Sequence, residues 1–121
     1  MKNLVYIFIG GGLGSVLRFA VSTYSQKFCT FKSFPIGTFA VNMLGCLLMG
    51  VLISLLARAD SSVKYLLITG FCGGFTTFSA FSAVNASLWQ NGNYFIVLSY
   101  ILLSVFIGIA AVYTGMQIVK S

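Results

Sequence analysis

Acidic side chains are almost missing from this chain of 121 residues, which contains one Asp, no Glu and no His. The side chains that usually transfer protons in enzymes and in proton-coupled transporters are therefore missing, and an enzyme is not expected. Only 7% of the residues are charged, whereas 59% are hydrophobic and the mean hydropathy is +1.01. This composition excludes a soluble domain of this size and predicts an integral membrane protein.

Cysteine is also scarce, since Cys29, Cys46 and Cys72 form an odd and widely spaced set. Their spacing predicts neither a disulfide framework nor a metal site. Cys46 and Cys72 fall within apolar segments, where a free thiol is expected to pack as a small hydrophobic group.

The formal net charge is +6, from seven Lys and Arg against the single Asp60. Because the cations flank hydrophobic segments, we expect them to anchor spans at lipid headgroups rather than to bind nucleic acid. The end that carries both termini is expected to hold Lys2, Arg58, Lys64 and Lys120, and the opposite end Lys27 and Lys32. This near balance leaves open whether the chain inserts in one orientation or in both, which would allow an antiparallel dimer.

Four apolar segments are each long enough to cross a bilayer, which needs roughly 20 residues. We predict an all-α membrane protein, one membrane domain over residues 1–121, with spans at 3–24, 35–57, 65–89 and 94–119. The first span lacks the cleavage pattern of a removable signal, so we expect it to be retained. Gly10 and Gly14 predict a close helix contact, and Pro35 suits the first turn of the second helix.

The third span is interrupted at its centre by residues 70–82, which include three glycines and four hydroxyl side chains. These residues lower helix propensity and offer the backbone competing hydrogen-bond partners. A broken backbone at membrane depth must face protein, water or an ion, and in transport proteins its free groups often form the binding site. We therefore predict a broken third helix that faces away from lipid.

Polar residues in the first two spans are candidates for function. Thr38, Asn42 and Gly45 share one face of the second helix. Asn42 either links helices by hydrogen bonds or donates to a passing anion. Arg18 is the one charged residue well inside a span, and it is either an interfacial anchor or an anion attractor.

After the interruption, Phe78, Phe81, Ser82 and Asn85 recur at intervals of three or four residues and share one helix face. Lipid would accept the rings but not the two polar groups together, so this face is expected to look inward. A phenyl ring has a positive edge that can contact a small anion, although packing of the two rings in a core remains the alternative.

The fourth span carries Tyr100, Ser104 and Gly108 at intervals of four residues, which gives a modest polar track. Taken together, the spans contain hydroxyls, amides, an Arg and ring edges but no Asp or Glu. A cation pathway usually shows acidic residues. The polar residues inside the membrane therefore favour an anion.

Three motifs, at residues 10–18, 37–42 and 70–82, resemble the bacterial CrcB/Fluc family of fluoride channels, and the similarity extends over all four spans. The resemblance implies a passive, fluoride-selective channel that exports cytoplasmic fluoride through the bacterial cytoplasmic membrane. It also implies a dual-topology, antiparallel homodimer with two pores. A structural Na⁺ at the dimer centre would be bound by the backbone carbonyls of Gly73 and Thr76.

The same resemblance assigns roles to single residues. The residues that correspond to the family's pore are Asn42, Phe78, Phe81, Thr38, Ser104 and Tyr100, and Arg18 corresponds to its arginine near the aqueous vestibule. The chain differs from many relatives at Val84, where they carry an acidic residue.

Two other classes stay open. A small proton-coupled drug exporter also has four spans, but it needs a carboxylate inside the membrane, and Asp60 lies in a link. A non-transporting assembly subunit would use the glycines and Asn42 for helix contacts alone. Ion flux through the purified protein distinguishes both from a channel.

Overall fold

The computed structural model describes residues 2–28 and 34–120, without the side chains of Gln26 and Phe28. The chain in these ranges is largely helical. Its elements are α1 (Lys2–Phe28), α2 (Ile36–Leu55), α3 (Ser61–Lys64), the π-helix η1 (Tyr65–Cys72), α4 (Gly73–Phe75), α5 (Ser79–Gln90) and α6 (Tyr94–Lys120). Cys29 and Lys32, which the sequence places in the first link, lie outside the described residues.

Within the described ranges, four helical stretches are long and apolar enough to cross a membrane, as predicted, and the protein is a multi-pass membrane protein. Their ends differ from the prediction by a few residues. The first helix continues to Phe28, the third stretch begins at Ser61, and Pro35 precedes α2 instead of lying in its first turn. Hydropathy locates the apolar part of a span, but polar residues at the interface can continue a helix without changing that signal.

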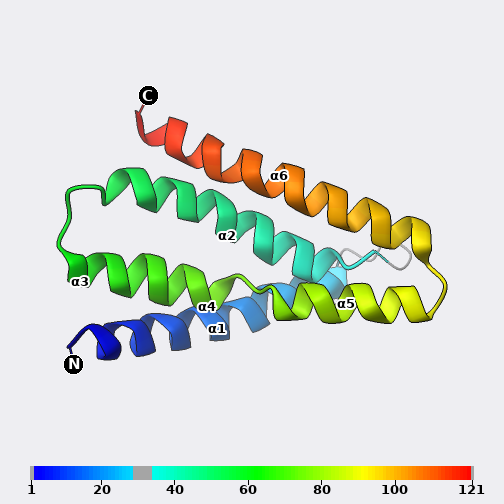
Figure 1. Cartoon of the computed structure of the whole chain (residues 1–121). Helices are drawn as coiled ribbons and strands as arrows, with labels where there is room; N and C mark the ends of the chain where they lie inside the picture. The colour runs from blue at the N-terminus through cyan, green and yellow to red at the C-terminus, as the bar shows by residue number, and fades with distance from the viewer. Residues whose placement is uncertain (1, 29–33, 121) are drawn as a thin grey trace.

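The four spans run alternately up and down, so the two termini lie at the same end of the molecule (Figure 1). Helix α6 lies along α2, and the α3–η1–α4 stretch lies along α1 (Figure 1). Helix α5 packs mainly on α6. The turn between α5 and α6 contains Gly92, whose φ of 81° is a left-handed conformation that suits glycine.

Glycines bring the helices of each pair into backbone contact. A Cβ atom at Gly10 or Gly14 of α1 would overlap the carbonyl oxygen of Leu66 or Phe71 in η1. A Cβ atom at Gly50 of α2 would likewise overlap the carbonyl oxygen of Val112 in α6. The prediction that Gly10 and Gly14 form a helix-packing face is therefore confirmed. In lipid, where apolar side chains gain little by leaving their surroundings, such close contact is a main source of helix association.

Large apolar side chains cover the outside of the bundle, among them Phe8, Phe95 and Ile109, with exposed fractions of 81%, 80% and 67%. This surface would be unfavourable in water, but it matches the acyl chains of a bilayer. The tightly buried interior is small and includes Val41, Cys72 and Tyr100.

The backbone conformation of the third span is not uniform. It begins as an α-helix, continues as the π-helix η1, and stops at Phe75. Thr76 is extended, with φ −84° and ψ 160°, and a helix begins again at Ser79. The interruption at residues 76–78 lies midway along the molecule, where α4 meets α5 (Figure 1). Nothing in the sequence predicted the π-helix.

Candidate functional site

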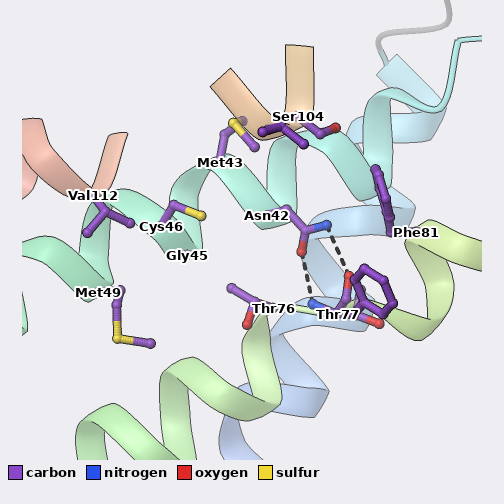
Figure 2. A pocket seen from close by; sticks show the side chains of 12 residues that line it. Asn42, Met43, Gly45, Cys46, Met49, Thr76, Thr77, Phe81, Ser104 and Val112 are labelled. Atoms are coloured by element: carbon purple, nitrogen blue, oxygen red, sulfur yellow. Dashed lines mark hydrogen bonds between the residues drawn. The ribbon is translucent and has the colours of Figure 1, made fainter. Parts of the chain in front are cut away.

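Asn42 of α2 is bound to the interruption of the third span through both ends of its carboxamide. Its Nδ2 atom donates to the carbonyl oxygen of Thr77 at 3.1 Å, and the backbone N–H of Thr77 donates to its Oδ1 atom at 2.9 Å (Figure 2). The side chain thus replaces partners that a continuous helix would have supplied. One Nδ2 hydrogen of Asn42 remains for another acceptor, because the amide group carries two.

Hydroxyl groups of the two threonines close the helix ends on either side. The Thr76 hydroxyl donates to the carbonyl oxygen of Cys72 at 2.9 Å, near the end of α4. The Thr77 Oγ1 atom accepts from the backbone N–H of Ala80 at 3.1 Å, in the first turn of α5, and lies 3.3 Å from Ser79 Oγ. The residue types that weakened helix propensity in the sequence therefore stabilise the two new ends.

These bonds redirect two backbone donors. In a continuous helix the N–H of Thr77 would donate to the carbonyl of Gly73, and that of Ala80 to the carbonyl of Thr76. Here Thr77 donates to Asn42 and Ala80 to the Thr77 hydroxyl. The carbonyl oxygens of Gly73 and Thr76 have thus lost their usual helical donors.

Arg18 of α1 also contacts the interrupted span, at α4. Its Nε atom donates to the carbonyl oxygen of Gly74 at 3.1 Å, and the side chain is half-buried. The remaining guanidinium donors can still act on an anion, because the group carries five N–H bonds. Arg18 is therefore attached to the interrupted span and is more than an anchor at the membrane surface.

An open groove with a volume of about 460 Å³ lies between α2, the interruption and α6 (Figure 2). Its lining includes four of the predicted site residues and Thr76, and none of its described lining residues is acidic. The groove is lined by Asn42, Met43, Gly45, Cys46, Met49, Thr76, Thr77, Phe78, Phe81, Ser104, Val105 and Val112. It is largely apolar, with its few polar groups near the interruption.

Aromatic rings follow one another beyond the interruption. The ring centroids of Phe78 and Phe81 are 5.8 Å apart, and those of Phe81 and Tyr100 are 5.0 Å apart. Phe78 is 78% exposed, whereas Tyr100 is fully buried. The inward orientation predicted for the face of Phe78, Phe81, Ser82 and Asn85 is thus wrong for Phe78 and Ser82 in the single chain, because α5 is covered mainly by α6 alone.

Two predicted site residues carry buried polar atoms without a partner among the described residues. They are the hydroxyl oxygens of Tyr100 and Ser104, both on α6. A buried hydroxyl without a hydrogen bond is unfavourable by about 1–3 kcal/mol. Each such atom is a candidate contact for an ion or a water molecule that the groove would admit.

The structure brings Asn42, Phe78, Phe81 and Ser104 together in one groove, and Tyr100 contacts it through Phe81. Thr38 lies one turn before Asn42 on α2, half-buried and outside the groove lining.

Arg18 meets the interrupted span from α1. Gly73 is exposed, and a Cβ atom there would meet open space.

Sequence reasoning missed Thr77, although it is the partner of Asn42, and it gave Cys46 a packing role alone. Cys46 lines the groove with Met43 and Met49. A signal for Met49 was present, because it lies seven residues after Asn42 and therefore on the same helix face. No local signal pairs Asn42 with Thr77, since 35 residues separate them.

The fold and the groove define a four-span helical membrane protein with a polar site at an interrupted third span. The chain belongs to the family described as CrcB-like protein, Camphor Resistance (CrcB), which matches residues 5–116.

Three relatives illustrate the similarity, and each is named fluoride-specific ion channel FluC. The protein from Azobacteroides pseudotrichonymphae is 48% identical, with 95% of this chain and 94% of the relative covered. The protein from Flavobacterium psychrophilum is 46% identical, with 99% and 98% covered. The protein from Agrobacterium fabrum is 40% identical, with 98% and 96% covered. These names are those of ion channels and not of enzymes.

Proposed function

We propose that this chain is a passive, fluoride-selective ion channel that exports fluoride from the bacterial cytoplasm. The observation that carries the proposal is the groove at the interrupted span, where an amide, a hydroxyl and two aromatic rings meet without an acidic side chain. The names of the relatives support the same ion. Passive export needs no proton relay, in keeping with a chain that has one acidic residue and no His.

The lining residues suit a small, strongly hydrated anion. Fluoride must exchange water for other donors in a narrow path. Asn42 supplies one N–H, and its two hydrogen bonds with Thr77 hold the amide in position. Ser104 supplies a hydroxyl that has no other partner among the described residues. Phe78 and Phe81 contribute the positive edges of their rings, which attract an anion without adding a charge that would trap it.

Export follows from the chemistry of a weak acid. Hydrogen fluoride crosses membranes as a neutral molecule and dissociates in a more alkaline cytoplasm, where the anion accumulates. A channel then lets fluoride leave down its electrochemical gradient and gives the cell fluoride resistance. We place the protein in the cytoplasmic membrane, surrounded by lipid, because this is the barrier that confines the anion.

The working unit is proposed to be a dual-topology, antiparallel homodimer with two pores. Phe78 is 78% exposed in the single chain, and the backbone at Gly73 borders open space. In a monomer Phe78, which lines the groove, would face lipid, although an ion path must be kept away from lipid. A second, inverted copy would cover this face and complete each groove.

A structural Na⁺ fits the carbonyl groups at the interruption. The oxygens of Gly73 and Thr76 have lost their usual helical donors, and hard cations prefer such oxygens. Among the described residues no cluster of His, Cys or acidic side chains offers another metal site. When bound, the ion would be coordinated by carbonyl oxygens from two copies.

The decisive experiment is flux from liposomes that contain the purified full-length protein. A fluoride electrode and a chloride electrode are read side by side. We expect rapid release of fluoride and little release of chloride. No fluoride release from assembled protein would overturn the channel proposal and favour an assembly subunit, whereas release that requires a proton gradient would favour a coupled exporter.

Sodium removal gives a separate prediction. Replacement of Na⁺ by N-methyl-D-glucamine on both sides should lower fluoride flux and the thermal stability of the dimer, because the carbonyls of Gly73 and Thr76 would lose their partner. The midpoint of thermal unfolding in detergent, measured with and without Na⁺, checks the effect. Equal midpoints and equal fluxes would exclude the proposed ion.

A further inference from the structure

Asn85 extends the polar face of α5 beyond the aromatic rings. It lies one turn after Phe81 and two turns after Phe78, on the same helix face. Phe81 in turn contacts Tyr100 of α6, with ring centroids 5.0 Å apart. Asn85 precedes the end of α5 at Gln90 by five residues, or about 8 Å along the helix. It thus lies between the aromatic rings and the nearer end of the molecule.

The Oδ1 atom of the half-buried Asn85 is buried without a hydrogen-bond partner among the described residues. Among the described residues, three buried side-chain atoms have no hydrogen bond: Asn85 Oδ1, the Tyr100 hydroxyl and Ser104 Oγ. Two of these belong to residues already placed in the proposed pore. Asn42 offers the contrast, since both ends of its carboxamide are bound to Thr77.

A purely structural role for Asn85 does not explain this difference. An asparagine with a structural role makes hydrogen bonds to a neighbouring segment, as Asn42 does to Thr77. A buried amide oxygen that accepts no hydrogen bond is unfavourable unless something outside the chain satisfies it. A water molecule in the path would provide that partner, because it can donate a hydrogen bond to the oxygen.

We propose that Asn85 is an additional contact for the permeating anion, at the step where fluoride passes between water and the aromatic rings. The inference rests on the proposed channel function. A carboxamide suits this step because it has both kinds of hydrogen-bonding group. Its NH2 group donates to the anion, and its Oδ1 atom accepts from a water molecule that still accompanies the ion.

The test uses full-length protein in liposomes, with fluoride flux measured for wild type, Asn85→Leu and Asn85→Asp. Leucine has a similar size but no polar atoms, and aspartate keeps only acceptors and repels an anion. Each variant should lower fluoride flux by about tenfold, which corresponds to one lost hydrogen bond to a charged group. Ser87→Ala, at an exposed position of α5, is the matched control and should conduct like wild type.

The dependence of flux on fluoride concentration separates ion contact from helix contact. If Asn85 contacts the ion, its replacement changes the fluoride concentration at which flux through the assembled protein is half-maximal. If Asn85 only links helices, its replacement lowers the amount of protein that assembles. Wild-type flux in assembled Asn85→Leu, or a loss explained wholly by poor assembly, would overturn the inference. If Asn85→Leu does not assemble, Asn85→Gln decides, because it keeps the amide but displaces it, and unchanged flux would again overturn the inference. Failure of wild type to conduct would instead overturn the channel function itself.

Discussion

Asn42 and Thr77 show how single residues make an interrupted span tolerable inside a membrane. The two hydrogen bonds between them satisfy the backbone of Thr77, which no longer belongs to a helix. Helix periodicity predicted that Asn42 shares a face with Thr38 and Gly45, and it left open whether the amide binds a helix or an anion. In the structure the amide binds the neighbouring segment at Thr77, and one N–H remains that can donate to an anion.

The rings of Phe78 and Phe81 are expected to be needed for fluoride flux. Phe81→Ile or Phe78→Ile should lower fluoride flux from liposomes by at least about tenfold, equivalent to about 1.4 kcal/mol in the barrier. The reason is that an aliphatic side chain has no positive edge to offer the anion. Phe8→Ile is the control, because Phe8 is 81% exposed on α1 and outside the groove. Wild-type flux in both groove variants would remove the ring-edge mechanism.

At the scale of elements, the bundle is organised by pairs of helices that meet at glycines. Helix α1 meets η1 at Gly10 and Gly14, and Gly50 brings α2 onto α6. The sequence predicted the first contact from the spacing of small residues, but it did not identify the partner helix. The partner is set by packing shape, because all four spans among the described residues are apolar and hydropathy does not distinguish their partners.

Gly10→Ala tests this packing. The added methyl group would overlap the carbonyl oxygen of Leu66, so α1 and η1 must separate, at a cost of about 1–3 kcal/mol. We expect a lower midpoint of thermal unfolding in detergent. Gly12→Ala is the matched control on the same helix, since a Cβ there meets open space. Equal midpoints for the two variants would contradict the contact.

For the whole molecule, an even number of spans places both termini at one end (Figure 1). The sequence predicts that the basic residues nearly balance between the two ends. Basic residues near span ends set orientation. A balanced chain is suited to insert both ways, which the proposed antiparallel dimer requires. The exposed link between α2 and α3 offers a place to disturb this balance.

Asp60→Lys combined with Ser61→Lys should fix the terminal end in the cytoplasm, because positive residues favour that side. Both positions are exposed, so the fold should be kept. Accessibility of a C-terminal tag from either side of the membrane measures orientation. Wild type should show both orientations. The double variant should show almost only one orientation and should lose most of its fluoride flux. Asp60→Asn with Ser61→Gln adds no basic residue; equal bias in this control would contradict the charge argument.

The sequence by itself determined the number of spans, the absence of acidic groups inside them and the weak point at residues 70–82. These properties are local, because span formation depends on the length and hydropathy of each segment. Only the tertiary structure decided that Asn42 holds Thr77 and that Arg18 reaches Gly74, across 35 and 56 residues. All four spans among the described residues are apolar, so hydropathy cannot choose among their pairings. Close packing and hydrogen bonds between distant segments choose them.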